Sequence, residues 1–122
     1  TLSAVPIDAK HYTKKAFIEE FNLDVELLQK LLEDGILVPL NDDDFTDKEL
    51  SIIKMIEDFK ELGLEYDLIY SYIYHAKQVS LLEQEIQIKL CDIRNDDNFS
   101  KLWKVMFDAL FNAKEYIFSR YT

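Results

Sequence analysis

Four aspartates that lie close together in the sequence are the residues of this chain best suited to bind a cation. They are Asp42, Asp43, Asp44 and Asp47, and carboxylate oxygens are the ligands that hard cations such as Ca²⁺ prefer. The sequence does not match the EF-hand pattern, because the sixth position counted from Asp42 is Asp47 instead of glycine and the twelfth is Ile53 instead of glutamate. We therefore expect a solvated turn with a capping carboxylate. An acidic patch for a basic partner remains the alternative.

The other reactive side chains do not form a recognisable catalytic set. His11 and His75 are the only histidines, and Cys91 is the only cysteine. A single cysteine forms no internal disulfide or Cys-based zinc site, and no histidine lies near it in the sequence to activate it. No Gly-rich phosphate loop and no Ser-His-Asp order is present. The sequence predicts no enzyme, no metal site and no cofactor.

Composition and charge restrict the classes of fold and partner. The chain has 122 residues, of which 48% are hydrophobic and only two are Gly and two Pro, so we expect a mainly α fold. The formal charge of −10 opposes DNA, because non-specific affinity comes from cations that displace condensed counterions. The same charge disfavours anionic membrane surfaces. No apolar run is long enough to span a membrane, and we expect a cytoplasmic protein.

Two short helices would position the groups near the N-terminus. Thr13 is a suitable N-cap for a helix over residues 14–21, and Asp24 for a second helix over 25–34. Gly35 would end the second helix. Two helices joined by a tight turn form a helix-turn-helix.

A short strand is predicted over residues 36–40, limited to a sheet edge by Pro39, followed by a polar turn over 41–44. Thr46 and Glu49 have the spacing of a capping box at the start of the next helix.

One long helix is predicted between residues 64 and 93, because no Gly or Pro interrupts this stretch after Gly63. Its apolar residues recur in steps of three and four, which is typical of helix pairing. These seam residues are Ile69, Tyr72, Ala76, Val79, Ile86, Leu90 and Ile93, and Glu83 alone interrupts them. The spacing does not distinguish pairing within the chain from pairing in a homodimer. A final helix is predicted over 99–121.

These features together resemble the MerR family of bacterial winged-helix transcriptional regulators. Tyr12 and Thr13 open the first helix as in that family, the sequence GILVP over 35–39 matches the exit from its recognition helix, and Leu62 and Gly63 match its third helix. The resemblance implies a winged helix-turn-helix over 11–73, a long pairing helix over 74–94 that forms a dimeric coiled coil, and a C-terminal helix over 98–122. We expect residues 1–10 to be a linker from the rest of a longer regulator.

The departures from the family pattern fall on the positions that contact DNA. The family's Arg-Tyr in the recognition helix is Gln29-Lys30 here, and its wing Gly-Tyr-Arg is Asn41-Asp42-Asp43. Aspartates there would repel the phosphate strand that a wing normally contacts. We therefore predict a degenerate regulatory or dimerisation unit that acts through protein–protein contacts.

Two alternatives remain open. In the first, the helix-turn-helix binds DNA directly through Lys14, Lys15, Gln29 and Lys30. In the second, the chain is similar to a chaperone-modulator adaptor, whose acidic patch would bind the basic J-domain of a DnaJ-type co-chaperone.

The aromatic residues suggest an effector pocket as a further possibility. MerR-like regulators that sense bulky drugs line such pockets with aromatic and acidic residues, and aromatic faces attract cationic ligands. The resemblance thus implies a pocket formed by Tyr70, Tyr74, Trp103 and Phe107. An ordinary helical core and dimer interface explains the same residues, and we favour that interpretation.

Overall fold

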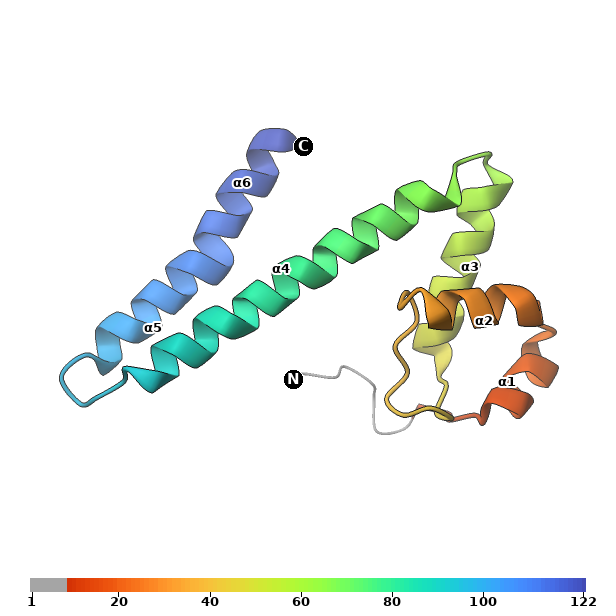
Figure 1. Ribbon diagram of the computed structural model, residues 1–122, viewed down its shortest axis with the longest axis horizontal. Helices are drawn as coiled ribbons and strands as arrows, with labels where there is room; N and C mark the ends of the chain where they lie inside the picture. The colour runs from red at the N-terminus through yellow and green to blue at the C-terminus, as the bar shows by residue number, and fades with distance from the viewer. Residues whose placement is uncertain (1–8) are drawn as a thin grey trace. The chain divides into compact units, whose positions relative to one another are not determined.

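The protein is mainly helical, as predicted. A computed structural model describes residues 9–122, and residues 1–8 of the expected linker lie outside them. In chain order the helices are α1 (Lys14–Phe21), α2 (Val25–Glu33), α3 (Asp47–Glu61), α4 (Tyr66–Asp92), α5 (Phe99–Phe107), the π-helix η1 (Asp108–Ala113) and α6 (Lys114–Tyr121) (Figure 1). Contacts divide the chain into two units, residues 1–74 and residues 75–122.

A tight turn joins α1 and α2, the two helices of the predicted helix-turn-helix, and both predicted N-caps are confirmed. The Thr13 side chain accepts a hydrogen bond from the Ala16 amide at 3.1 Å. The Asp24 carboxylate accepts from the amides that open α2. Between the helices, Asn22 adopts the left-handed conformation with φ 50°, which asparagine tolerates better than most residues. These local signals fix where each helix begins and ends.

A compact core holds α1, α2 and α3 together. Phe17 of α1 stacks on Phe45 with ring centroids 5.1 Å apart, and both side chains are fully buried. Leu28 and Leu31 of α2 point into the same core, because residues at helical spacing share one face. The buried core residues are Phe17, Leu23, Leu28, Leu31, Ile36, Leu37, Phe45, Ile53 and Ile56.

The strand predicted over residues 36–40 is wrong. No residue between 9 and 122 belongs to a strand, and the one isolated bridge pairs Tyr12 with Phe45. The amides of Ile36 and Leu37 both donate to the Leu31 carbonyl, at 3.0 and 3.1 Å, after Gly35 has turned the chain with φ 71°. These amides complete the end of α2, so they are not available for a sheet ladder.

The capping box predicted for α3 is confirmed. The Thr46 side chain accepts from the Lys48 amide, and the Glu49 carboxylate accepts from the Thr46 amide at 2.8 Å. Gly63 ends the turn after α3 with φ 86°, a conformation that L side chains rarely adopt. The chain then enters α4.

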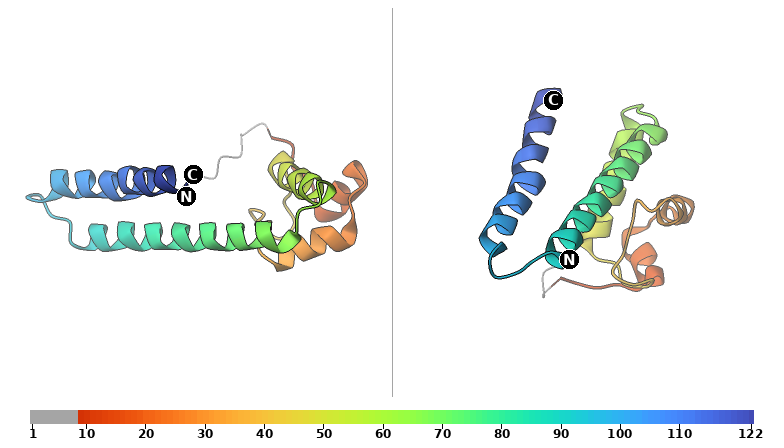
Figure 2. Two further views of the ribbon diagram at one scale, coloured as in Figure 1. Left: turned by 90° about the horizontal axis from the view of Figure 1, so that it is seen from above. Right: turned by 60° about the vertical axis from the view of Figure 1, so that its left-hand side comes forward.

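The predicted long helix is α4, which runs without interruption from Tyr66 to Asp92. Its C-terminal part belongs to the second unit and lies beside α5, η1 and α6 as an antiparallel helical hairpin (Figures 1 and 2). Asn95 and Asn98 shape the turn, since each side chain accepts from backbone amides of that turn. Among residues 9–122, no helix is long and apolar enough to cross a membrane.

The final helix is not α-helical throughout, contrary to the prediction. Residues 108–113 form a π-helical turn between α5 and α6. Each residue of an α-helix turns the chain by about 100°. Residues four apart are therefore offset by about 40° around the helix axis, and the offset grows with each further step. The π turn holds more residues per turn, which counteracts this offset. Consequently Leu102, Met106, Leu110 and Lys114, spaced by four, are all among the less exposed residues of the hairpin.

Candidate functional site

The cations proposed to contact DNA are mostly engaged inside the helix-turn-helix. Lys14 Nζ donates to Gln29 Oε1 at 3.0 Å, which joins α1 to α2. Lys30 Nζ lies 3.6 Å from Asp34 Oδ2 and 4.7 Å from the centre of the Tyr66 ring. Lys15 is exposed. A phosphate would therefore have to compete with existing partners for Lys14 and Lys30.

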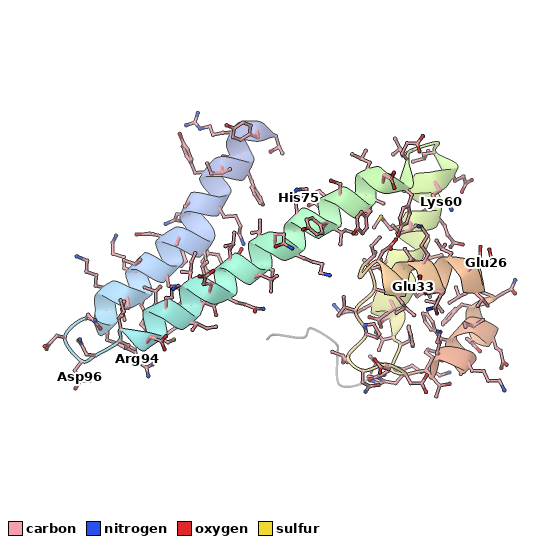
Figure 3. All side chains as sticks on the ribbon, in the orientation of Figure 1. Glu26, Glu33, Lys60, His75, Arg94 and Asp96 are labelled. Carbon is pink, nitrogen blue, oxygen red and sulfur yellow. The ribbon has the colours of Figure 1, made fainter. Side chains whose placement is uncertain are left out.

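Negative charge is concentrated in the first unit. Residues 1–74 contain seven Lys and Arg against seventeen Asp and Glu, whereas residues 75–122 contain seven against seven. The first unit thus has a formal charge of −10, and the second has none. Glu26 and Glu33 project from α2 (Figure 3), the helix that would have to enter a DNA groove. The charge of the first unit suits a basic protein better than a phosphate backbone.

Two of the four clustered aspartates have structural partners. Asp43 Oδ1 accepts from the Lys14 amide at 2.6 Å, so its charge lies at the N-terminus of α1, where the helix dipole favours it. Asp44 Oδ1 lies 2.6 Å from His11 Nδ1. Asp42 and Asp47 are exposed. Within residues 9–122, no three His, Cys, Asp or Glu side chains are arranged to hold a metal ion.

A polar contact links the end of α2 to the start of α4. The Tyr66 hydroxyl donates to Asp34 Oδ2 at 2.7 Å. Burial, and then the hydrogen bond to the carboxylate, raises the pKa of Tyr66 well above its ordinary value. Asp34 is the C-cap of α2, where the helix dipole disfavours a negative charge. Lys30 and Tyr66 together offset that cost and hold the first residue of α4 against the end of α2.

The predicted seam residues of α4 lie in three different environments. Ile69 packs against the core of the first unit. Leu90 is half-buried inside the hairpin of the second unit, as is Glu83, which meets Lys114 of α6. Tyr72 and Ile93 are largely exposed. Ala76 is exposed, and so are Val79 and Ile86, each with 37% of its surface accessible.

The hairpin of residues 75–122, all of which the structure describes, exposes most of its apolar side chains. Leu110 alone is buried, with 7% of its surface exposed. The large apolar side chains that are exposed number fifteen: Val79, Leu81, Leu82, Ile86, Ile88, Ile93, Phe99, Trp103, Val105, Phe107, Phe111, Tyr116, Ile117, Phe118 and Tyr121. Exposed apolar surface of this extent is typical of interaction sites.

A small hollow lies at the closed end of the hairpin. It is lined by Leu90 and Cys91 of α4, by Arg94 of the turn, and by Phe99, Leu102, Trp103 and Met106 of α5 (Figure 3 labels Arg94). Its volume of about 50 Å³ is well below the roughly 300–1,000 Å³ of small-molecule sites. The hollow has room for the end of one apolar side chain.

The four candidates for an effector pocket are divided between the two units. Tyr70 and Tyr74 belong to the first unit, with ring centroids 6.4 Å apart. Trp103 and Phe107 belong to the second, and Trp103 lines the small hollow. Phe99 and Phe111 follow the same spacing of four as Trp103 and Phe107, but they were not among the four pocket candidates.

No protein-family model, no curated protein and no solved structure matches this chain.

Proposed function

We propose that the chain is a regulatory and self-association unit of a MerR-like bacterial transcription regulator, and that it acts through protein–protein contacts in the cytoplasm. The first unit would be a degenerate winged helix-turn-helix. The second would be the association module. The family resemblance over residues 12–73 supports the first assignment, with the two confirmed N-caps of the helix-turn-helix.

The observation that carries this proposal is the exposed apolar surface of residues 75–122. A two-helix hairpin of this length, with Leu110 as its one buried apolar side chain, buries too little surface to offset the conformational entropy lost on folding. A partner that covers the exposed side chains would supply the missing burial. Association therefore explains why this sequence keeps so many large apolar residues outside.

Direct DNA binding is the weaker alternative for two reasons. The first unit has a formal charge of −10, which opposes the counterion release that gives proteins their non-specific affinity for DNA. In addition, Lys14 and Lys30 already have partners in Gln29 and Asp34. The same charge favours a basic protein as the partner of the first unit.

The test combines sedimentation equilibrium with a DNA-binding assay on the full chain. We expect the apparent mass to rise with protein concentration between about 1 µM and about 1 mM, and a labelled duplex to stay free at about 50 mM salt. The opposite result, a monomer that retards the duplex with a steep salt dependence, would replace the proposed function by direct DNA binding.

A further inference from the structure

Four aromatic rings form one exposed stripe along α5 and η1. Phe99, Trp103, Phe107 and Phe111 follow one another at intervals of four residues and are between 46% and 58% exposed. Phe99 and Trp103 have ring centroids 6.3 Å apart, and Phe107 and Phe111 have centroids 5.1 Å apart. No charged residue belongs to this series. The aromatic stripe is therefore an exposed apolar surface formed by two pairs of neighbouring rings along α5 and η1.

The hollow at the closed end of the hairpin adjoins the aromatic stripe, because Phe99 and Trp103 belong to both. A pocket of about 50 Å³ beside exposed aromatic rings has the features of an interface hot spot, where one side chain of the partner fills a depression and aromatic residues surround it.

We propose, on the basis of the self-association proposed above, that a second copy of this chain docks on the aromatic stripe, so that two hairpins form a four-helix bundle. A two-fold interface uses the same patch on both copies, so the patch must complement itself. Aromatic rings meet this condition because they pack edge-to-face or offset against other rings. Helices that bury such apolar stripes against one another are the basis of four-helix bundles.

The exposed area of the aromatic stripe fits the centre of such an interface. A fully covered aromatic side chain buries about 200 Å², so four half-exposed rings offer about 400 Å² on each copy. A stable interface needs about 800 Å² from each partner. The rings thus provide about half of this requirement, and the bordering apolar side chains of the hairpin would provide the rest.

Charge selects a second copy over a basic partner for this surface. The hairpin has seven positive and seven negative side chains, so it neither attracts a highly charged protein nor repels its own copy. The whole chains, each with a charge of −10, do repel one another. Salt screens this repulsion, so salt should strengthen self-association, whereas it would weaken the binding of a basic partner.

The experiment uses two matched variants of the full chain, Phe107→Glu and Ile88→Glu. Both residues are exposed, at 54% and 61%, and both substitutions add one negative charge. Ile88 lies on α4, outside the aromatic stripe and the hollow. The dimer dissociation constant is measured by sedimentation equilibrium at low and high salt. Trp103 is the only tryptophan, so its quenching by acrylamide reports directly whether the stripe is covered.

We expect Phe107→Glu to raise the dissociation constant at least about thirtyfold, as for the loss of a hot-spot residue, and Ile88→Glu to leave it nearly unchanged. Trp103 should become less quenchable as protein concentration rises, and salt should lower the dissociation constant. Dimers that survive Phe107→Glu but not Ile88→Glu would overturn the aromatic stripe as the interface and leave the proposed self-association intact. A monomer at every concentration would overturn both.

Discussion

Lys114 Nζ lies 2.9 Å from Glu83 Oε1, and this ion pair joins α6 to α4 across the hairpin. Both side chains are partly buried, with 37% and 26% of their surface exposed. Glu83 is the one residue that interrupts the apolar spacing of α4. A charge at a helix interface finds its partner in only one alignment, so such a pair can fix the register of two helices.

Breaking this pair should destabilise the hairpin. We expect Lys114→Met to lower the free energy of unfolding by about 1–2 kcal/mol, because the Glu83 carboxylate stays partly buried without its partner. Urea unfolding followed by circular dichroism measures the change, and a double-mutant cycle with Glu83→Gln isolates the coupling.

Lys104 offers a matched control for that experiment. Its Nζ lies equally close to a carboxylate, 2.9 Å from Asp108 Oδ2, but its side chain is 77% exposed. Water screens an ion pair at such a site, so Lys104→Met should leave the unfolding curve almost unchanged. Equal effects of the two lysine substitutions would mean that Glu83–Lys114 is an ordinary surface pair.

Local sequence signals predicted most helix boundaries correctly, because caps depend on a few neighbouring residues. Thr13, Asp24 and Thr46 cap the helices that they were expected to cap, and Gly35 turns the chain after α2. The strand prediction failed because a short run of apolar residues around Pro39 is compatible with a strand and with an irregular segment alike. What decided the outcome was the use of the Ile36 and Leu37 amides by the Leu31 carbonyl, which no periodicity reveals.

The environment of the α4 apolar residues was beyond the reach of the sequence. Helical spacing shows that residues share a face, but it does not show what covers that face. Ile69 packs on the first unit, Leu90 lies inside the hairpin and Ile93 is exposed, although all three follow one spacing. The π turn at residues 108–113 likewise has no local signature.

The stacked pair Phe17 and Phe45 should carry much of the stability of the first unit. Phe17→Ala removes a fully buried ring and leaves a cavity beside Phe45, so we expect a loss of about 3–5 kcal/mol. Thermal and urea unfolding measure it. Val25→Ala, at an exposed position of α2, is the control and should change stability little. A small loss at Phe17 would show that the neighbouring core collapses into the space.

The capping box of α3 predicts that substitutions of Thr46 destabilise the protein to different degrees. Thr46→Ala removes the oxygen that accepts from the Lys48 amide at 3.2 Å, and we expect a loss of about 1–2 kcal/mol. Thr46→Ser keeps the oxygen and should lose clearly less. The two variants are compared by urea unfolding at neutral pH. If serine were as damaging as alanine, packing of the buried Thr46 methyl group would matter more than the cap.

The contact between Tyr66 and Asp34 predicts a pH-dependent contribution to stability. Tyr66→Phe removes the hydroxyl that donates to Asp34 at 2.7 Å, and we expect a loss of about 1 kcal/mol near neutral pH. The pKa of Tyr66 is raised in the folded protein by burial and by the hydrogen bond to Asp34. The unfolded chain therefore releases the phenolic proton first, near pH 10, and from there upward unfolding becomes easier as pH rises. The contribution is complete below about pH 10 and declines above it.

Thermal melting at about pH 8 and about pH 11 measures this dependence. Tyr66→Phe lacks the titrating group, so the difference in melting temperature between the wild type and this variant should shrink at the higher pH. Tyr121→Phe is the control, because Tyr121 is 85% exposed and should show no such dependence. A difference between wild type and Tyr66→Phe that stays constant over this range would mean that the Tyr66 hydroxyl is not held by Asp34 in solution.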